Sequence, residues 1–243
     1  MAYKLKEKLH TIPVNDAFDE DSECPLCAMV ESLEENAIDF TMGQSYMEDD
    51  VRGETSRLGF CSKHAKRLYG HQNRLGLALI IQTHMKKVIK EVEKSGGLVS
   101  KVTKPSLFKK EKTTREASYI SKVQSSCYIC EKVDGTFDRY VDTLFHLYRR
   151  EDEFRKKFNS CKGFCTNHYQ LLSEQASRSL SGSLQDDFIK KLNSLYIDNM
   201  KRVVDDLEWF IDKFDYRYKD EPWGDSKDAL QRALRKMNSI NLE

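Results

Sequence analysis

The chain has 243 residues, of which 33% are charged and 39% are hydrophobic, and its formal net charge is +1. This composition excludes a disordered chain and predicts a soluble, folded protein with an apolar core. The near-neutral charge excludes a strong overall attraction to nucleic acid or to anionic membranes.

Hydrophobic periodicity in the first half predicts helices and little else. Residues 1–23 read as a polar lead-in, extended around Pro13. A helix is expected over residues 26–42, where apolar residues recur at helical spacing. A weaker helical piece over residues 46–52 leads to a turn at Gly59. The next helix begins at Cys61 and breaks near residues 71–73. It then resumes up to Gly96-Gly97.

The second half repeats this plan. Residues 98–124 contain Pro105 and many Ser and Thr residues, which is typical of a linker. A helical face runs from Val133 to Tyr148, and Phe154 and Phe158 extend it towards Gly163. A long helix is expected over 184–214, a turn over 215–224, and a short final helix that Asp225 caps at its N-terminus. No run of alternating β-branched residues is present, so the predicted fold is all-α.

One motif occurs twice in the chain. Cys24-Pro-Leu-Cys27 is followed after 33 residues by Cys61 and His64, within Gly59-Phe-Cys-Ser-Lys-His64. Cys127-Tyr-Ile-Cys130 is followed after 34 residues by Cys165 and His168, within Gly163-Phe-Cys-Thr-Asn-His168. The chain is therefore a tandem repeat of a C-x2-C…G-F-C-x2-H unit.

Three thiolates and one imidazole are a typical ligand set for tetrahedral zinc. Residues i and i+3 share one face of a helix, so both CxxC and CxxH can direct two ligands at one ion. The intervening residues fit an out-and-back hairpin with arms of about 15 residues, each roughly 22 Å long. We therefore expect the four ligands of each repeat to bind one ion. The predicted ligands are Cys24, Cys27, Cys61 and His64 in the first repeat, and Cys127, Cys130, Cys165 and His168 in the second.

Four protein ligands leave no open position on the ion, which is typical of a structural site. Such a site can contribute on the order of 10 kcal/mol to folding. The expected cofactors are two zinc ions. A Cys3His iron–sulfur cluster remains an alternative, because spacing does not separate the two. A further alternative is that these residues are buried small hydrophobic thiols and core histidines.

The remaining cysteine and four histidines lie outside the repeat. Cys161 has Arg57 as its counterpart and reads as an ordinary free thiol. The histidines without ligand spacing are His10, His71, His84 and His146. The thioredoxin interpretation of Cys24 and Cys27 needs a βαβ unit, which the sequence does not predict. A redox switch based on zinc-bound thiolates stays open.

Charge is unevenly distributed along the chain. Residues 9–51 contain many carboxylates and no Lys or Arg, whereas the 101–122 segment is basic. These stretches read as solvated surfaces, or else as an electrostatic match between domains or subunits. Nucleic-acid binding is disfavoured because only the 101–122 linker carries the required charge.

Several functional classes lack their motifs. The sequence has no Gly-rich phosphate loop, no G-x-S-x-G and no H-E-x-x-H, so no catalytic constellation is predicted. The aromatic residues between Trp209 and Trp223 form part of the core or a docking face for a protein partner or a second copy of the chain.

The N-terminus lacks the apolar run of a secretory signal, and the apolar stretch over 75–81 is too short to span a bilayer. We therefore expect a cytoplasmic protein without membrane attachment. In a reducing compartment its cysteines are metal ligands rather than disulfides.

The duplicated motif, together with Lys213-Phe-Asp-Tyr-Arg217 and Glu221-Pro-Trp-Gly224, resembles an uncharacterised bacterial family of duplicated Cys/His helical zinc-binding proteins. The resemblance covers about Cys24 to Met237. It implies a bacterial, cytosolic setting and a pair of metal sites, and it implies no activity.

The expected architecture is two helical hairpins, each closed by a Cys3His site, followed by long C-terminal helices. The expected boundaries are a lead-in over 1–23, a first unit over 24–97, a linker over 98–124 and a second unit over 125–243. Three functions remain open: a non-enzymatic interaction or adaptor protein, a redox- or metal-responsive regulator, and an iron–sulfur protein.

Overall fold

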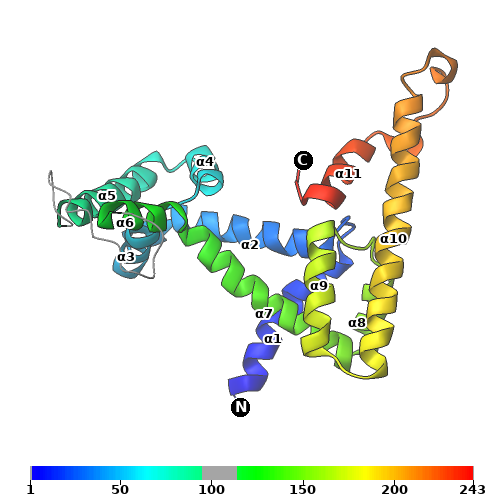
Figure 1. Ribbon diagram of the computed structural model, residues 1–243, viewed down its shortest axis with the longest axis horizontal. Coiled ribbons are helices and arrows are strands. Elements are labelled where there is room, and N and C mark those ends of the chain that lie inside the picture. Colours follow the sequence, from blue (N-terminus) through cyan, green and yellow to red (C-terminus); the bar gives the residue numbers. More distant parts are fainter. Residues whose placement is uncertain (1, 95–113, 243) are drawn as a thin grey trace, which may run out of the picture. The chain divides into compact units, whose positions relative to one another are not determined.

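The structure, a computed structural model, describes residues 2–94 and 114–242. Within these ranges the chain forms eleven α-helices and three short 3-10 helices, with no β-strand (Figure 1). The all-α prediction is confirmed.

The chain divides into two compact units that interleave along the sequence. The first comprises Met1–Glu31 and Phe137–Glu243, and the second comprises Ser32–Thr136. The dividing points fall inside α2 (Pro25–Met42) and α7 (Tyr128–Arg150). These units differ from the domain boundaries expected at residues 24, 98 and 125, because the two ends of the chain fold together.

The second unit contains the helices between α2 and α7. They are η1 (Gln44–Met47), α3 (Asp49–Leu58), α4 (Ser62–Gly70), α5 (Arg74–Lys94) and α6 (Arg115–Gln124). Residues 115–124 of the expected linker are thus helical, and residues 98–113 lie outside the described residues.

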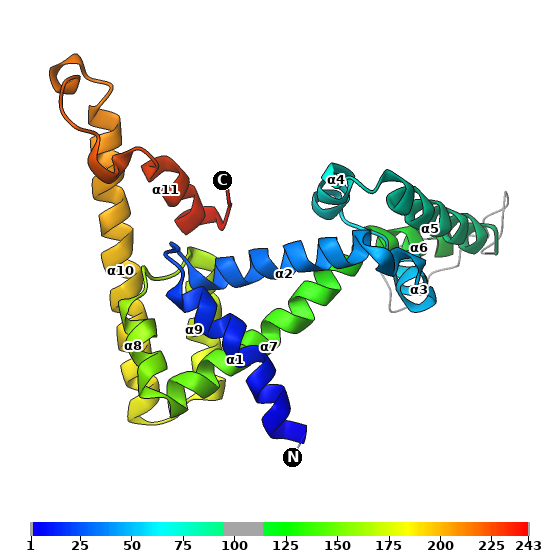
Figure 2. The same cartoon turned by 180° about the vertical axis from the view of Figure 1, so that it is seen from behind.

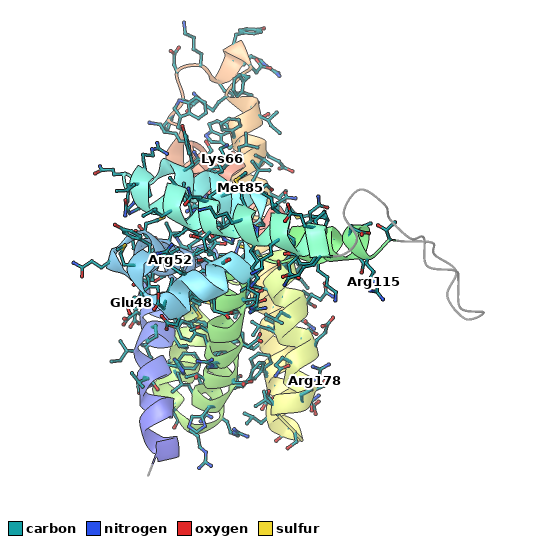
Figure 3. The ribbon with its side chains drawn as sticks, turned by 90° about the vertical axis from the view of Figure 1, so that its left-hand side faces the viewer. Glu48, Arg52, Lys66, Met85, Arg115 and Arg178 are labelled. Atoms are coloured by element: carbon teal, nitrogen blue, oxygen red, sulfur yellow. The ribbon has the colours of Figure 1, made fainter. Side chains whose placement is uncertain are left out.

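Helices α3 and α5 pack directly on each other. Arg52 of α3, labelled in Figure 3, donates to the Thr83 hydroxyl of α5 across 3.3 Å. The Ser56 hydroxyl and carbonyl face the same turn of α5, where the carbonyl lies 2.8 Å from His84 Nδ1. The segment after α2 therefore packs on α5 and does not form the returning arm of a hairpin.

The first unit contains α1 (Ala2–Asp19), α8 (Asp152–Ser160), α9 (Thr166–Ser179), α10 (Ser183–Asp212) and α11 (Ala229–Asn238), with η2 (Tyr216–Tyr218) and η3 (Gly224–Ser226). Helix α9 packs beside the long α10, and α11 contacts both (Figures 1 and 2).

The lead-in expected to be extended is instead helix α1, with Pro13 inside it. Val14 and Phe18, one helical turn apart, are buried in the core. The Phe18 ring meets Phe154 of α8 with ring centroids 5.0 Å apart. Burial of this apolar face outweighs the lost backbone hydrogen bond at the proline.

Aromatic side chains fill the core of the first unit. Phe158 lies at its centre, fully buried, with ring centroids 5.0 Å from Phe188 and 5.4 Å from Phe164. Phe164 is the phenylalanine of the second Gly-Phe-Cys motif, so the motif is anchored directly in the core. Cys24, Cys27 and Cys165 belong to this same cluster.

The end of α10 differs in part from expectation. Trp209 and Phe210 pack against the following turn, whereas Phe214 and Tyr216 are 76% and 86% exposed. The final helix begins at Ala229 with Asp228 at its N-cap, so Asp225 is not the cap.

The acidic N-terminal stretch is paired with bases inside each unit. In the first unit Glu23 binds Arg202 and Glu31 binds Arg235. In the second unit Glu34 binds Arg67. These carboxylates are therefore more than a solvated face.

None of the helices in the described residues combines the length and the apolar character that crossing a membrane requires.

Candidate metal centres

Both Gly-Phe-Cys motifs begin with a glycine in a left-handed backbone conformation. Gly59 has a φ of 62° and Gly163 a φ of 78°. A Cβ on Gly163 would lie 2.8 Å from the Leu195 carbonyl oxygen, and one on Gly59 would lie 2.6 Å from His84 Nε2. Glycine is required at both turns, and each turn lies two residues before a cysteine of a candidate site.

Each Cys-x2-His motif starts a helix. Cys61 is the N-cap of α4 and Cys165 is the N-cap of α9. Three residues later, His64 and His168 return to the same face of the first turn. The exposed amides at a helix N-terminus also favour a thiolate there.

The first candidate site, called site 1, consists of Cys24, Cys27, Cys165 and His168. His168 Nδ1 lies 3.4 Å from Cys24 Sγ, 3.4 Å from Cys27 Sγ and 3.3 Å from Cys165 Sγ. The Cys27 and Cys165 sulfurs are 3.6 Å apart. All three cysteines are buried, and all four residues belong to the first unit.

Site 2 consists of Cys61, His64, Cys127 and Cys130, all in the second unit. His64 Nδ1 lies 3.3 Å from Cys61 Sγ, 3.3 Å from Cys127 Sγ and 3.4 Å from Cys130 Sγ. Cys61 and Cys130, whose sulfurs are 4.0 Å apart, are only half-buried. Either group of four could hold a metal ion.

The predicted pairing within each repeat is wrong. The structure joins the CxxC of the first repeat to the CxxH of the second, and the CxxC of the second to the CxxH of the first. Helix α2 carries the chain about 27 Å away from Cys24 at 1.5 Å per residue over its 18 residues. The chain then packs on α5 instead of returning. Hence Cys61 meets Cys127 and not Cys24.

Backbone contacts hold the exchanged motifs together at site 2. Tyr128, inside the second CxxC, donates its N–H to the Gly59 carbonyl across 3.0 Å. The Ser126 hydroxyl donates to the neighbouring Leu58 carbonyl across 2.7 Å. Two elements far apart in the sequence thus meet through one glycine turn.

The sequence profile of a family of unknown function (DUF6062) matches residues 5–243, nearly the whole chain. The chain belongs to this family. No curated protein and no solved structure gives a significant match.

In this family member, the histidines of the two sites have different neighbours. His64 Nε2 lies 3.2 Å from Glu34 Oε1, and Glu34 is also bound by Lys63 and Arg67. A carboxylate on the second ring nitrogen fixes the orientation of a metal-binding imidazole. The residue equivalent to Glu34, ten positions after the first cysteine of its CxxC, is Phe137. Its ring lies 5.4 Å from the ring of His168.

Hydrogen bonds shift the protonation of site 2. Burial raises the pKa of Cys127, but hydrogen bonds, that with His64 foremost, lower it overall to about 6. The bond to Cys127, aided by Glu34, raises the pKa of His64 to about 9. These hydrogen bonds thus favour a Cys127 thiolate beside a His64 imidazolium.

Site 1 shows the same pattern in a drier setting. Burial lowers the pKa of His168, but hydrogen bonds to Cys165 and Cys24 raise it overall to about 9. Hydrogen bonds from Cys24 and Cys27 lower the pKa of Cys165. In each site one thiol, Cys127 or Cys165, is thus favoured as the thiolate, the form of cysteine that binds metal, whereas the pKa of Cys130 and of Cys27 is raised.

The residues outside the repeat are not brought into either site. Cys161 packs against the core of the first unit, and burial raises its pKa to about 11, as befits an unreactive thiol. His84 binds the Ser56 carbonyl, and His10 packs against the ring of Tyr140. The Nε2 atom of His71 lies 3.8 Å from Oδ1 of Asp39.

Two kinds of residue around the sites were missed by sequence reasoning. The sequence predicts Glu34 only as one carboxylate of the acidic 9–51 stretch, and it predicts the residues of α11 only as a short final helix. The only available signal was the position of Glu34, because a buried carboxylate on the apolar side of a helix requires a partner.

Proposed function

We propose that the protein is a non-enzymatic helical scaffold stabilised by two zinc ions. The proposed ligands are Cys24, Cys27, Cys165 and His168 for one ion, and Cys61, His64, Cys127 and Cys130 for the other. The observation that carries the proposal is the spacing of the ligand atoms in both groups.

A single tetrahedral zinc ion requires Zn–S bonds of about 2.3 Å and Zn–N bonds of about 2.0 Å, which set its ligand atoms about 3.5–3.8 Å apart. The nitrogen–sulfur separations of 3.3–3.4 Å and the sulfur–sulfur separations of 3.6 and 4.0 Å lie within about 0.2 Å of this range. An iron–sulfur cluster places several atoms between its cysteines and needs wider separations. The spacing therefore favours zinc.

Four protein ligands per ion leave no position for water or substrate, which supports a structural role. Each ion would link segments far apart in the sequence: Cys27 with Cys165 at site 1, and Cys61 with Cys130 at site 2. Such links remove much conformational freedom from the unfolded chain, so each ion would stabilise the unit that contains it.

A scaffold needs a surface for a partner, and the C-terminal end of α10 supports a protein partner or self-association. Ile211, Phe214 and Tyr216 are 62%, 76% and 86% exposed. Exposed aromatic residues of this kind are typical anchors of protein interfaces. A cytoplasmic location belongs to the same proposal, because thiolate ligands require a reducing compartment.

Site 2 also supports a second candidate function, that of a redox-responsive regulator. Cys61 and Cys130 are half-buried and their sulfurs are 4.0 Å apart. Hydrogen peroxide could oxidise these two thiolates to a disulfide. Two electrons would pass to the peroxide, which takes up two protons and leaves as two waters, and the zinc ion would be released.

Metal analysis of protein purified without added metal tests the proposal. We expect a colourless protein with two zinc ions per chain. A brown protein with iron and acid-labile sulfide would contradict zinc binding, and a metal-free folded protein would contradict metal binding altogether. Release of one zinc ion by mild peroxide, with a disulfide between Cys61 and Cys130, would support the second candidate.

A further inference from the structure

The two sites are closed by different parts of the chain, although their motifs are equivalent. At site 2 the second CxxC is tied to the Gly59 turn by neighbouring groups: the Ser126 hydroxyl, 2.7 Å from the Leu58 carbonyl, and the Tyr128 amide, 3.0 Å from the Gly59 carbonyl. Both donors flank Cys127 directly in the sequence.

The equivalent donors do not exist at site 1. The residue at the position of Tyr128 is Pro25, which has no N–H. The residue at the position of Ser126 is Glu23, which has no hydroxyl group. Neither of these positions can therefore tie Cys24 to the Gly163 turn as Ser126 and Tyr128 tie Cys127 to the Gly59 turn.

At site 1, Lys236 of α11 makes the connection that Ser126 and Tyr128 make at site 2. Its ammonium group donates to the Glu23 carbonyl across 2.7 Å and to the Lys162 carbonyl. Glu23 immediately precedes Cys24, and Lys162 immediately precedes Gly163, as Leu58 precedes Gly59. One side chain thus joins the two motifs that form site 1.

The surroundings of Lys236 are built for a charged group. Its side chain is 1% exposed, and its ammonium group lies 3.1 Å from Glu23 Oε2, which also binds Arg202. Burying an ammonium group is costly unless it is fully hydrogen-bonded and paired. The burial of Lys236 is therefore explained by its contacts at site 1.

The end of the same helix reaches a ligand atom. Ser239, which follows α11, donates its hydroxyl to Cys165 Sγ across 3.1 Å and accepts from the Asn167 side chain across 3.1 Å. One turn earlier, Arg235 forms a two-bond pair with Glu31 of α2. A hydrogen bond to a ligating thiolate orients it and adjusts its affinity for metal.

We propose that α11 is the closing element of site 1, with Lys236 and Ser239 as positioning residues for its metal ion. The helix holds Cys24 and Cys27 against Cys165 and slows release of the ion. In the described residues no helix holds site 2 in the way that α11 holds site 1. The ion of site 2 is therefore released before the ion of site 1. This inference rests on the proposed function, because it assumes that both sites bind zinc.

The test uses the full-length protein loaded with two zinc ions and an excess of a chelator. Zinc release is followed with a colorimetric indicator, and newly free cysteines are identified by alkylation and mass spectrometry. We expect two phases in the wild type. Cys61, Cys127 and Cys130 become alkylated in the fast phase, and Cys24, Cys27 and Cys165 in the slow phase.

Lys236→Met should accelerate the slow phase about tenfold, because it removes the hydrogen bonds that the charged ammonium group donates to the Glu23 and Lys162 carbonyls, and it should leave the fast phase unchanged. Ser239→Ala should accelerate the slow phase by a smaller factor. Ser126→Ala should accelerate only the fast phase. Lys227→Met, which removes an exposed lysine before α11, is the matched control and should change neither phase.

Equal acceleration of both phases by Lys236→Met, or acceleration of neither, would overturn the proposal. If Lys236→Met does not fold, Ser239→Ala decides, and an unchanged slow phase in that variant overturns it. A wild-type protein that binds fewer than two zinc ions would instead contradict the proposed function, so the two failures are distinguishable.

Discussion

The backbone N–H of Tyr128 donates to the carbonyl of Gly59 across 3.0 Å. This bond joins the CxxC motif of the second repeat to the GFCxxH motif of the first. The same cross-pairing of the repeats forms both candidate metal sites, because each repeat supplies two of the four ligands of each site.

The exchange predicts which cysteines lose protection when one ligand is removed. Cys165→Ser should release the zinc ion of site 1, so Cys24 and Cys27 should become reactive towards iodoacetamide. Cys127 and Cys130 should stay protected, because their partners are Cys61 and His64. Peptide mass spectrometry after alkylation measures this directly. Reactivity at Cys127 and Cys130, with Cys24 protected, would restore pairing within each repeat.

Gly163→Ala should destabilise the first unit by about 1–3 kcal/mol, because a non-glycine residue is strained at positive φ. The added Cβ would also approach the Leu195 carbonyl oxygen at 2.8 Å. Urea denaturation of the zinc-loaded protein measures the change in free energy of unfolding. Gly135→Ala in α7 is the control, since a Cβ there meets nothing within 4 Å, and it should be neutral or stabilising.

Glu34→Gln should weaken zinc binding at site 2 by about 10–100-fold, because it removes the carboxylate that orients His64. Competition with a chelator of known affinity measures the change, and site 1 should be unaffected. Glu35→Gln is the matched control, because the neighbouring Glu35 is exposed. Equal affinities for the two variants would show that Glu34 has no role in zinc binding.

Phe158→Ala should cost about 3–5 kcal/mol of stability, the usual loss for a buried phenylalanine. Its ring is fully buried and contacts Phe18, Tyr148, Phe164 and Phe188. Phe214→Ala, which removes a ring that is 76% exposed, should have little effect on unfolding. A similar loss in both variants would indicate that Phe214 is buried in solution, for example in a self-associated form.

The hydrophobic periodicity of the sequence was sufficient to predict most of the helices. The expected helix over 26–42 is α2 (Pro25–Met42), and the face from Val133 to Tyr148 belongs to α7 (Tyr128–Arg150). Helix α1 was missed because Pro13 and a polar composition point away from a helix. Its stability comes from contacts between Phe18 and aromatic residues far away in the sequence, which no local pattern contains.

The sequence by itself determined the set of eight candidate ligands, because CxxC and CxxH spacing is a property of one turn of chain. It also placed a turn at the glycine before each Phe-Cys-x2-His segment. Both features depend on residues within six positions of one another, and the structure retains both.

Only the tertiary structure decided which CxxC motif combines with which CxxH motif. Two CxxC and two CxxH motifs of nearly identical local geometry fit together in either pairing, so spacing cannot choose between them. The choice depends on where α2 leads the chain, on the bond between Tyr128 and Gly59, and on the contact of Lys236 with Glu23 and Lys162. These contacts join residues 69 to 213 positions apart, and their energies arise only once the helices have packed.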